Sequence, residues 1–177
     1  MTEFQAFTKI PRLSRNMIIT EKLDGTNAIV HISDDGKEIK AGSRTRWIQP
    51  GSDNFGFALW VEQNKDDLLT LGPGYHYGEW WGLGIQRGYD LFERRFSLFN
   101  VGRWNANPPP KCCHVVPILY EGEFDTTKVE THLLMLKETG SIAAPGYTNP
   151  EGIVIYHEAA RCLFKKTFEN DEKGKEQ

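Results

Sequence analysis

The sequence has no excess of basic residues. It contains 21 Lys and Arg against 24 Asp and Glu, and its formal net charge is −3. A strongly basic chain binds nucleic acid through its overall charge, so any such partner of this chain must be held by a local basic patch. The near-neutral charge also makes tight, unaided binding of long duplexes unfavourable.

Cysteine is scarce as well, with Cys112, Cys113 and Cys162. The adjacent pair lacks the two-residue gap of a zinc knuckle, and an odd total argues against a disulfide framework. We therefore predict a reducing compartment and a cytoplasmic location.

Long apolar runs are missing. No stretch approaches the roughly 18 apolar residues of a membrane span, and the N-terminus has no basic start followed by an apolar core, so we expect no membrane partner. With 177 residues, 39% hydrophobic and 25% charged, the chain fits one globular domain. We place this domain at residues 1–168, followed by a charged, frayed tail at 169–177.

Short apolar runs between glycine and proline turns predict an α+β fold of antiparallel β-sheets with few flanking helices. Two helices are expected, one from Asn54 to Leu71, capped by Ser52 or Asp53, and one that begins at Asp125 and ends before Gly140. The predicted strands are 17–22, 27–33, a third through Gly42, 75–82, 95–101, 115–120, 152–156 and 162–168. The first two strands are expected to pair as a hairpin.

The segment Glu21-Lys22-Leu23-Asp24-Gly25-Thr26-Asn27 joins these two strands. As a plain hairpin turn it needs only a Gly25 with positive φ. Alternatively, the turn holds Lys22 at the mouth of a pocket. There a partly desolvated amine close to other cations would lose its proton and become a nucleophile.

Two carboxylates stand where such a lysine would need them. Glu79 lies inside an otherwise aromatic strand, where an unpaired carboxylate is costly, and Glu151 begins a strand beside a glycine. Together they could hold a magnesium ion through its waters and the phosphates of a substrate.

Cationic and aromatic groups complete the set. Arg44 ends a strand with a guanidinium that suits phosphate or ribose, and Phe99 could stack on a base. Lys165 and Lys166 lie on the last strand, where one could meet an α-phosphate. Taken singly, each has an ordinary alternative: a solvated face, core packing or surface lysines.

In order, Lys22-x-Asp24-Gly25-Thr26-Asn27, Arg44, Gly78-Glu79, Phe99, Glu151-Gly152 and Lys165 resemble the nucleotidyltransferase motifs of polynucleotide ligases and capping enzymes. The resemblance extends from Glu21 to Phe168. Two segments together, Glu21-Lys22-x-x-Gly25-Thr26-Asn27 and Gly78-Glu79-x-x-Gly82-x-Gly84-Ile85-Gln86, make the chain most similar to the RNA ligase 2 branch of ATP-dependent RNA ligases. The Gly-Ile-Gln element is the more discriminating of the two.

This resemblance implies ATP and Mg²⁺ or Mn²⁺ as cofactors and RNA ends, nicked or single-stranded, as partners. A lysyl-AMP forms, AMP moves to a 5′-phosphate, and a 3′-hydroxyl displaces it. Glu151 and Glu79 would serve the metal, and Glu151 and Lys165 would assist Lys22 in catalysis. The resemblance also implies the residues that bind ATP. Glu21 would lie at the adenine edge, Glu79 would hold the ribose, and Phe99 would stack on adenine. The other ATP-binding residues would be Lys22, Asn27, Arg44, Lys165 and Lys166.

The last motif departs from the family, which separates its two lysines by one residue, whereas Lys165 and Lys166 are adjacent. We expect neither an OB domain nor a helical C-terminal domain after the last motif. We therefore expect the substrate to be held by this domain alone or with an end-healing or RNA-binding partner protein. A DNA ligase core and a non-catalytic nucleotide- or RNA-binding module remain the alternatives.

Overall fold

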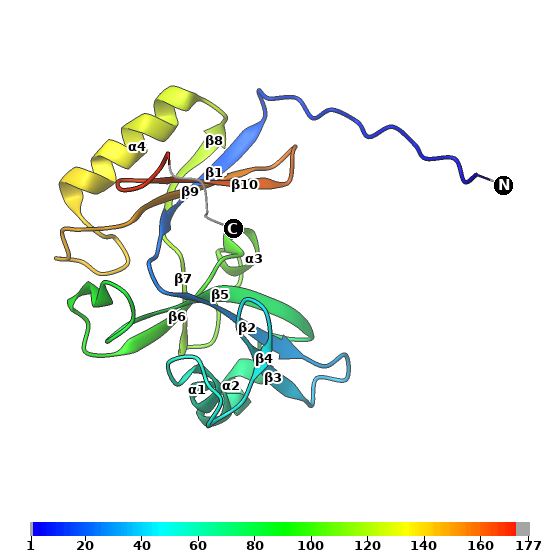
Figure 1. Cartoon of the computed structure of the whole chain (residues 1–177), viewed down its shortest axis with the longest axis vertical. Helices are drawn as coiled ribbons and strands as arrows, with labels where there is room; N and C mark the ends of the chain where they lie inside the picture. The colour runs from blue at the N-terminus through cyan, green and yellow to red at the C-terminus, as the bar shows by residue number, and fades with distance from the viewer. Residues whose placement is uncertain (1, 173–177) are drawn as a thin grey trace.

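The computed structural model describes residues 2–172, which form two β-sheets, one packed against a single helix and the other against two (Figure 1). The smaller sheet has the strand order β10-β9-β1-β8, and the larger has the order β4-β3-β2-β5-β6-β7. Every pair of neighbouring strands is antiparallel except β6 and β7. The predicted α+β architecture of antiparallel sheets with few helices is confirmed.

The four-stranded sheet buries one face against helix α4 (Thr126–Thr139). Met17 and Ile19 alternate with less buried residues along β1, and together with Leu133 and Leu136 of the helix they form a compact apolar cluster. The carboxylate of Asp125 accepts the backbone N–H of Thr127 and so caps the helix at its predicted start. The strands are β1 (Asn16–Lys22), β8 (Ile118–Glu123), β9 (Gly152–His157) and β10 (Cys162–Thr167).

The six-stranded sheet buries one face against helices α1 (Phe57–Gln63) and α2 (Lys65–Leu69). Trp80 and Phe96 of the sheet pack tightly on Phe57, with ring centroids 5.3 and 5.1 Å apart. Its strands are β2 (Thr26–Ile32), β3 (Ile39–Gly42), β4 (Trp47–Ile48), β5 (Gly74–Gly82), β6 (Arg94–Leu98) and β7 (Cys113–Val115).

The prediction of one helix from Asn54 to Leu71 is wrong, because two helices occupy this range. The helical segment is broken at Asn64, whose ψ of 18° leaves the helical range, and it begins only after Gly56. Asp53 nevertheless acts as a cap, since its two carboxylate oxygens accept the backbone N–H groups of Ala58 and Leu59.

The predicted hairpin of the first two strands is also wrong. β1 pairs with β8 and β9, whereas β2 pairs with β3 and β5, so neither strand has a free edge for the other. The glycine between them is needed for close approach and not for positive φ, because a Cβ on Gly25 would meet the carbonyl oxygen of Trp80 and come within 2.7 Å of Cβ of Trp81. The turn is therefore a crossing between sheets.

A second crossing splits the strand predicted at 115–120. Its residues fall in β7 of the larger sheet and β8 of the smaller, with Val116 and Pro117 between them. Two short helical segments were not predicted: η1 (Gly88–Asp90) and α3 (Val101–Trp104). The two crossings bring the ends of strands from both sheets to one seam.

Near the C-terminus, residues 169–172 contact β10. Thr167 donates its backbone N–H to the Asp171 carboxylate and its hydroxyl to the carbonyl oxygen of Glu169. The rest of the predicted tail, 173–177, lies outside the described residues. Within residues 2–172 no helix has the length and apolar character needed to cross a membrane.

Candidate functional site

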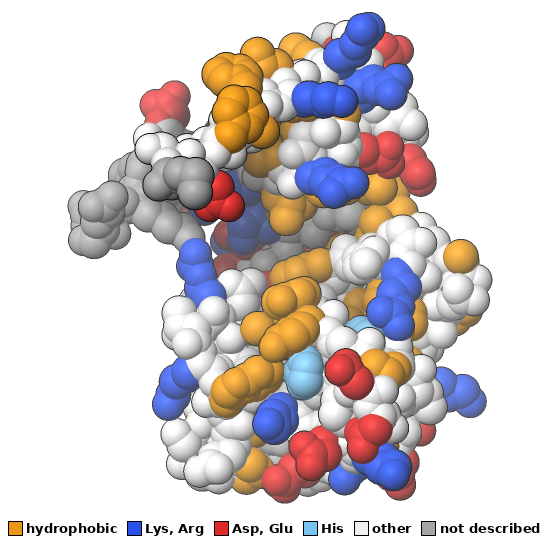
Figure 2. All heavy atoms as spheres, turned by 90° about the vertical axis from the view of Figure 1, so that its right-hand side faces the viewer, with side chains coloured by type: hydrophobic (Ala, Val, Ile, Leu, Met, Phe, Trp, Pro, Cys, Tyr) orange, Lys and Arg blue, Asp and Glu red, His pale blue; other side chains and the backbone are white. Residues whose placement is uncertain are grey.

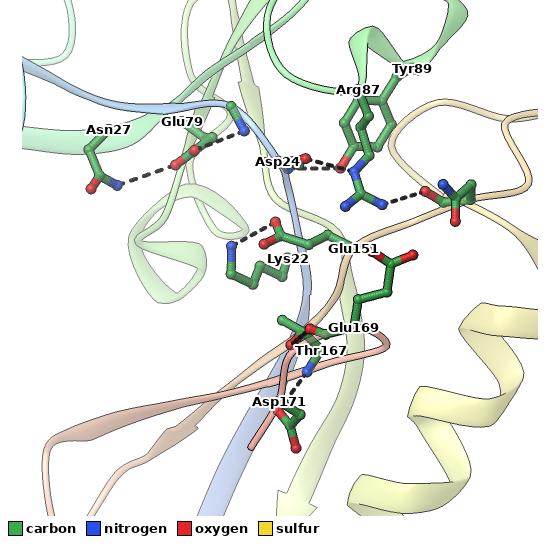
Figure 3. A network of polar contacts seen from close by, with 12 residues as sticks. Lys22, Asp24, Asn27, Glu79, Arg87, Tyr89, Glu151, Thr167, Glu169 and Asp171 are labelled. Carbon is green, nitrogen blue, oxygen red and sulfur yellow. Dashed lines mark hydrogen bonds and ion pairs between the residues drawn. The ribbon is translucent and has the colours of Figure 1, made fainter. Parts of the chain in front are cut away.

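Lys22 and Glu151 meet at the seam between the two sheets (Figure 3). Lys22 is the last residue of β1 and pairs with Gly152, so Glu151 is the residue just before its partner strand. The Lys22 Nζ lies 2.6 Å from Oε2 of Glu151, and 23% and 19% of the two side chains are exposed. The structure thus brings the predicted nucleophile and the predicted metal carboxylate into contact.

Glu79 reaches the same seam from the larger sheet. Its carboxylate accepts the backbone N–H of Gly25 at 3.1 Å and the side-chain amide of Asn27 at 3.3 Å. Burial raises the pKa of Glu79 to about 7, against the opposing charge of Lys22. Near neutral pH the charged and neutral forms of this carboxyl group are therefore similarly populated.

Three residues that the sequence reasoning did not assign also line the seam. Arg87 donates from Nε to Asp24 at 2.7 Å and from Nη1 to the carbonyl oxygen of Asn149 at 2.8 Å, while the backbone N–H of Asp24 donates to the hydroxyl of Tyr89. Burial acts to lower the pKa of Arg87, but the contact with Asp24 prevails and the pKa is raised.

These contacts tie the segment before Glu151 to the turn after Lys22. Arg87 follows the Gly-Ile-Gln element directly, and Asp24 is part of the lysine motif, so the sequence marked both neighbourhoods. It carried no signal that the two side chains meet.

The two lysines of the last strand lie on opposite faces. Lys165 pairs with Val154, on the face of the sheet that carries Lys22, and it lines a pocket together with Glu151 and Arg87. Lys166 turns the other way, toward Glu130 at 3.2 Å and Asp171 at 3.7 Å. The structure brings Lys165 to the site and leaves Lys166 outside it.

Thr167 occupies the site-facing position that follows Lys165. It pairs with Gly152, which in turn pairs with Lys22, so the three residues form one row across the sheet. A Cβ at Gly152 would collide with the carbonyl oxygen of Lys166, which explains the glycine after Glu151.

Glu21 has different contacts from those expected. It is 1% exposed, and its carboxylate accepts hydrogen bonds from Ser141 and from the backbone N–H groups of Ile142 and Ala143. Burial raises its pKa, which these hydrogen bonds oppose. Its carboxylate therefore anchors the segment after α4, and its predicted place at the adenine edge stays a prediction.

Arg44 and Phe99 both lie on the larger sheet, and Phe99 is level with Tyr77 and Ile29, one row beyond Asn27 and Glu79. Gly42 pairs with Ile29, and Arg44 follows it, exposed, in the turn before β4. Phe99 directly follows β6, donates its backbone N–H to Tyr77 and is 41% exposed. Both are accessible, and their predicted contacts with a nucleotide stay predictions.

Among residues 2–172 no group of three or more His, Cys, Asp or Glu side chains is arranged to hold a metal ion. Glu79 and Glu151 offer only carboxylate oxygens, which suit a hard divalent cation that keeps waters and phosphate oxygens as its other ligands.

The RNA ligase family model matches residues 15–168, so the chain belongs to the RNA ligase family. No curated protein matches its sequence significantly.

Among solved structures, the chain is similar to a mutant Naegleria gruberi RNA ligase with ATP and Mn, at 22% identity and a TM-score of 0.67, covering 93% of this chain and 53% of that one. An apo mutant of Naegleria gruberi RNA ligase also matches, at 22% identity and a TM-score of 0.64, over 87% of this chain and 50% of that one. These likenesses show the fold. The chain spans about half the length of the structures it matches.

Proposed function

We propose that the chain joins RNA ends at the expense of ATP, with Lys22 as the group that carries AMP. The observation that supports this most directly is the 2.6 Å contact between Lys22 and Glu151, two motif residues that lie 129 positions apart. Family membership supplies the reaction class, and the seam supplies a lysine flanked by carboxylates and a second lysine.

In the first step Nζ of Lys22 attacks the α-phosphorus of ATP, the bond to the β-phosphate oxygen breaks, and pyrophosphate leaves. The attacking amine must first lose a proton, and Glu151 is in position to accept it. Lys165, on the same face, neutralises charge on the transferred phosphoryl group.

In the later steps an oxygen of a 5′-phosphorylated RNA end attacks the lysyl-AMP phosphorus and the N–P bond breaks. A 3′-hydroxyl then attacks the 5′-phosphate, forms the phosphodiester and releases AMP. The seam residues serve these steps by holding the nucleotide in place, because phosphoryl transfer depends mainly on positioning and charge neutralisation.

ATP and Mg²⁺ or Mn²⁺ are the proposed cofactors. The similar Naegleria gruberi RNA ligase structures include complexes with ATP and Mn. The carboxylates of Glu79 and Glu151 would suit a cation of this class. Bound there through water, the cation would supply positive charge beside the phosphates. Asn27, Arg44, Glu79 and Phe99 are proposed nucleotide contacts, and a cytoplasmic location is consistent with the free cysteines.

The test is incubation of the protein with ATP and Mg²⁺ or Mn²⁺, followed by intact-mass measurement. We expect a gain of one AMP, which Lys22→Ala abolishes and Lys128→Ala, a change of a helix lysine, leaves unchanged. Absence of any AMP gain with either metal would leave a non-catalytic binding module as the function.

A substrate panel then separates RNA from DNA ligation. Nicked RNA, nicked DNA and single-stranded RNA with a 5′-phosphate are supplied to the AMP-loaded protein. Transfer of AMP to RNA ends is expected; transfer to DNA ends alone would assign a DNA ligase core. Adding an end-healing enzyme to RNA that lacks a 5′-phosphate tests the proposed need for a partner.

A further inference from the structure

The face of the larger sheet that is not covered by helices carries exposed aromatic side chains. Trp47, Tyr75 and Tyr77 are 50%, 53% and 53% exposed, and His31 lies among them. We call these four residues the aromatic strip. Figure 2 shows a band of hydrophobic side chains across the half of the molecule built on the larger sheet. The band lies below the hollow between the two halves, and Lys and Arg side chains lie near it (Figure 2).

The strip is continuous with the candidate site. On β2 and β5 the pair Asn27 and Glu79 belongs to the site, Tyr77 pairs with Ile29 one step further, and Tyr75 pairs with His31 a step beyond that. Side chains two residues apart on a strand share a face and lie roughly 7 Å apart. Tyr75 is therefore about 14 Å along the sheet from Glu79, a distance of a few nucleotides.

The rings are arranged as a shared surface. Tyr75 lies 6.0 Å from Tyr77 with planes 14° apart, and 6.2 Å from Trp47 with planes 25° apart. His31 lies 4.4 Å from Tyr75. These mutual contacts reduce the rotational freedom that each ring would lose on binding a ligand.

Positively charged side chains lie beside the aromatic strip, near the edge of the sheet. Lys40 is exposed and pairs directly with His31, which places it on the same face. Arg44 and Arg46 are exposed in the turn that leads to Trp47. A surface with aromatic faces and flanking positive charge is complementary to bases joined by phosphates.

We propose that the aromatic strip binds unpaired bases of an RNA strand whose end lies in the candidate site. Stacking on these rings accepts any base, and the flanking cations contact the backbone. The strip explains how a chain with a net charge of −3 holds RNA without a strongly basic surface. The location of the bound end rests on the proposed function; binding of the single strand does not.

The experiment measures binding of a 3′-labelled, 5′-phosphorylated single-stranded RNA of about 12 nucleotides by fluorescence polarisation, without ATP. Tyr75→Ala and Trp47→Ala are each expected to weaken binding about tenfold. Tyr75→Phe, which keeps the ring, and Phe7→Ala, which removes an exposed aromatic side chain outside the strip, should stay within about threefold of the unmodified protein.

AMP attachment is measured in the same variants and should be unchanged. Unaltered RNA binding by Tyr75→Ala and Trp47→Ala overturns the proposal, as does equal competition by a blunt RNA duplex. Light scattering adds a further check: a dimer that the two alanine variants convert to monomer, with RNA binding retained, would assign the strip to self-association. If the unmodified protein takes no AMP yet the variants lose RNA binding, only the ligase function fails.

Discussion

The ammonium of Lys22 lies 2.6 Å from the carboxylate of Glu151, and this contact joins the end of β1 to the start of β9. In the proposed function, this contact would hold Lys22 where its attack on ATP starts. The contact pairs the lysine with an anion, whereas the sequence led us to expect a neighbouring cation.

Replacing Glu151 by Gln tests this contact. The amide keeps the size of the side chain but cannot take a proton or bind a cation well, so we expect AMP attachment to slow by at least about 100-fold. The rate of AMP gain by mass spectrometry is the measurement, and circular dichroism confirms that the variant is folded. A rate within about threefold of the unmodified protein would contradict the role of Glu151.

The two adjacent lysines of β10 are expected to differ. Lys165→Ala should reduce the rate of AMP attachment about 100-fold or more, because a charge that faces the transferred phosphate is lost. Lys166→Ala is the matched control and should stay within about threefold, since it removes only exposed pairs with Glu130 and Asp171. The reverse order of the two effects would show that the register has been misassigned.

Arg87 and Asp24 should act as a unit. In a double-mutant cycle of Arg87→Ala and Asp24→Asn, unfolding free energies from urea denaturation should show a coupling of about 1 kcal/mol, as is usual for a partly exposed ion pair. Both single variants should also slow AMP attachment, because Arg87 tethers the carbonyl of Asn149 near Glu151. Strictly additive free energies would mean that the pair contributes nothing.

Glu79 predicts a dependence of stability on pH. Its pKa is about 7 in the folded chain against 4.5 in the reference state, so the folded protein binds more protons between these values and loses stability as the pH rises through them. Relative to Glu79→Gln, the unmodified protein should lose about 2–3 kcal/mol of unfolding free energy between about pH 5 and pH 8, measured without metal. A pH-independent difference between the two would contradict the raised pKa.

Gly25 predicts a packing defect. Gly25→Ala places a Cβ against Trp80 and Trp81, so we expect a loss of about 2 kcal/mol or more in unfolding free energy, measured by urea denaturation. Gly102→Ala is the control, because its Cβ meets only ordinary contacts in α3 and should stabilise the chain by about 0.5–1 kcal/mol. A neutral Gly25→Ala would contradict the close packing of the crossing between the sheets.

Local patterns in the sequence determined the elements and most of the candidate groups. Short apolar runs marked β1 and β9, and Asp125 and Gly140 marked the limits of α4. The order of Lys22, Glu79 and Glu151 along the chain pointed to nucleotidyl transfer. The elements depend on neighbouring residues and the motifs on their order along the chain, and the sequence displays both directly.

Only the tertiary structure decided which strands pair and which faces meet. The strands on either side of Gly25 looked like a hairpin, yet each found two other partners, because strand pairing satisfies backbone groups over the whole sheet. The same register turned Lys165 toward Lys22 and Lys166 away from it. The Arg87–Asp24 pair and the buried place of Glu21 likewise depend on segments far apart in the chain. Proximity of this kind is fixed by packing and leaves no local mark in the sequence.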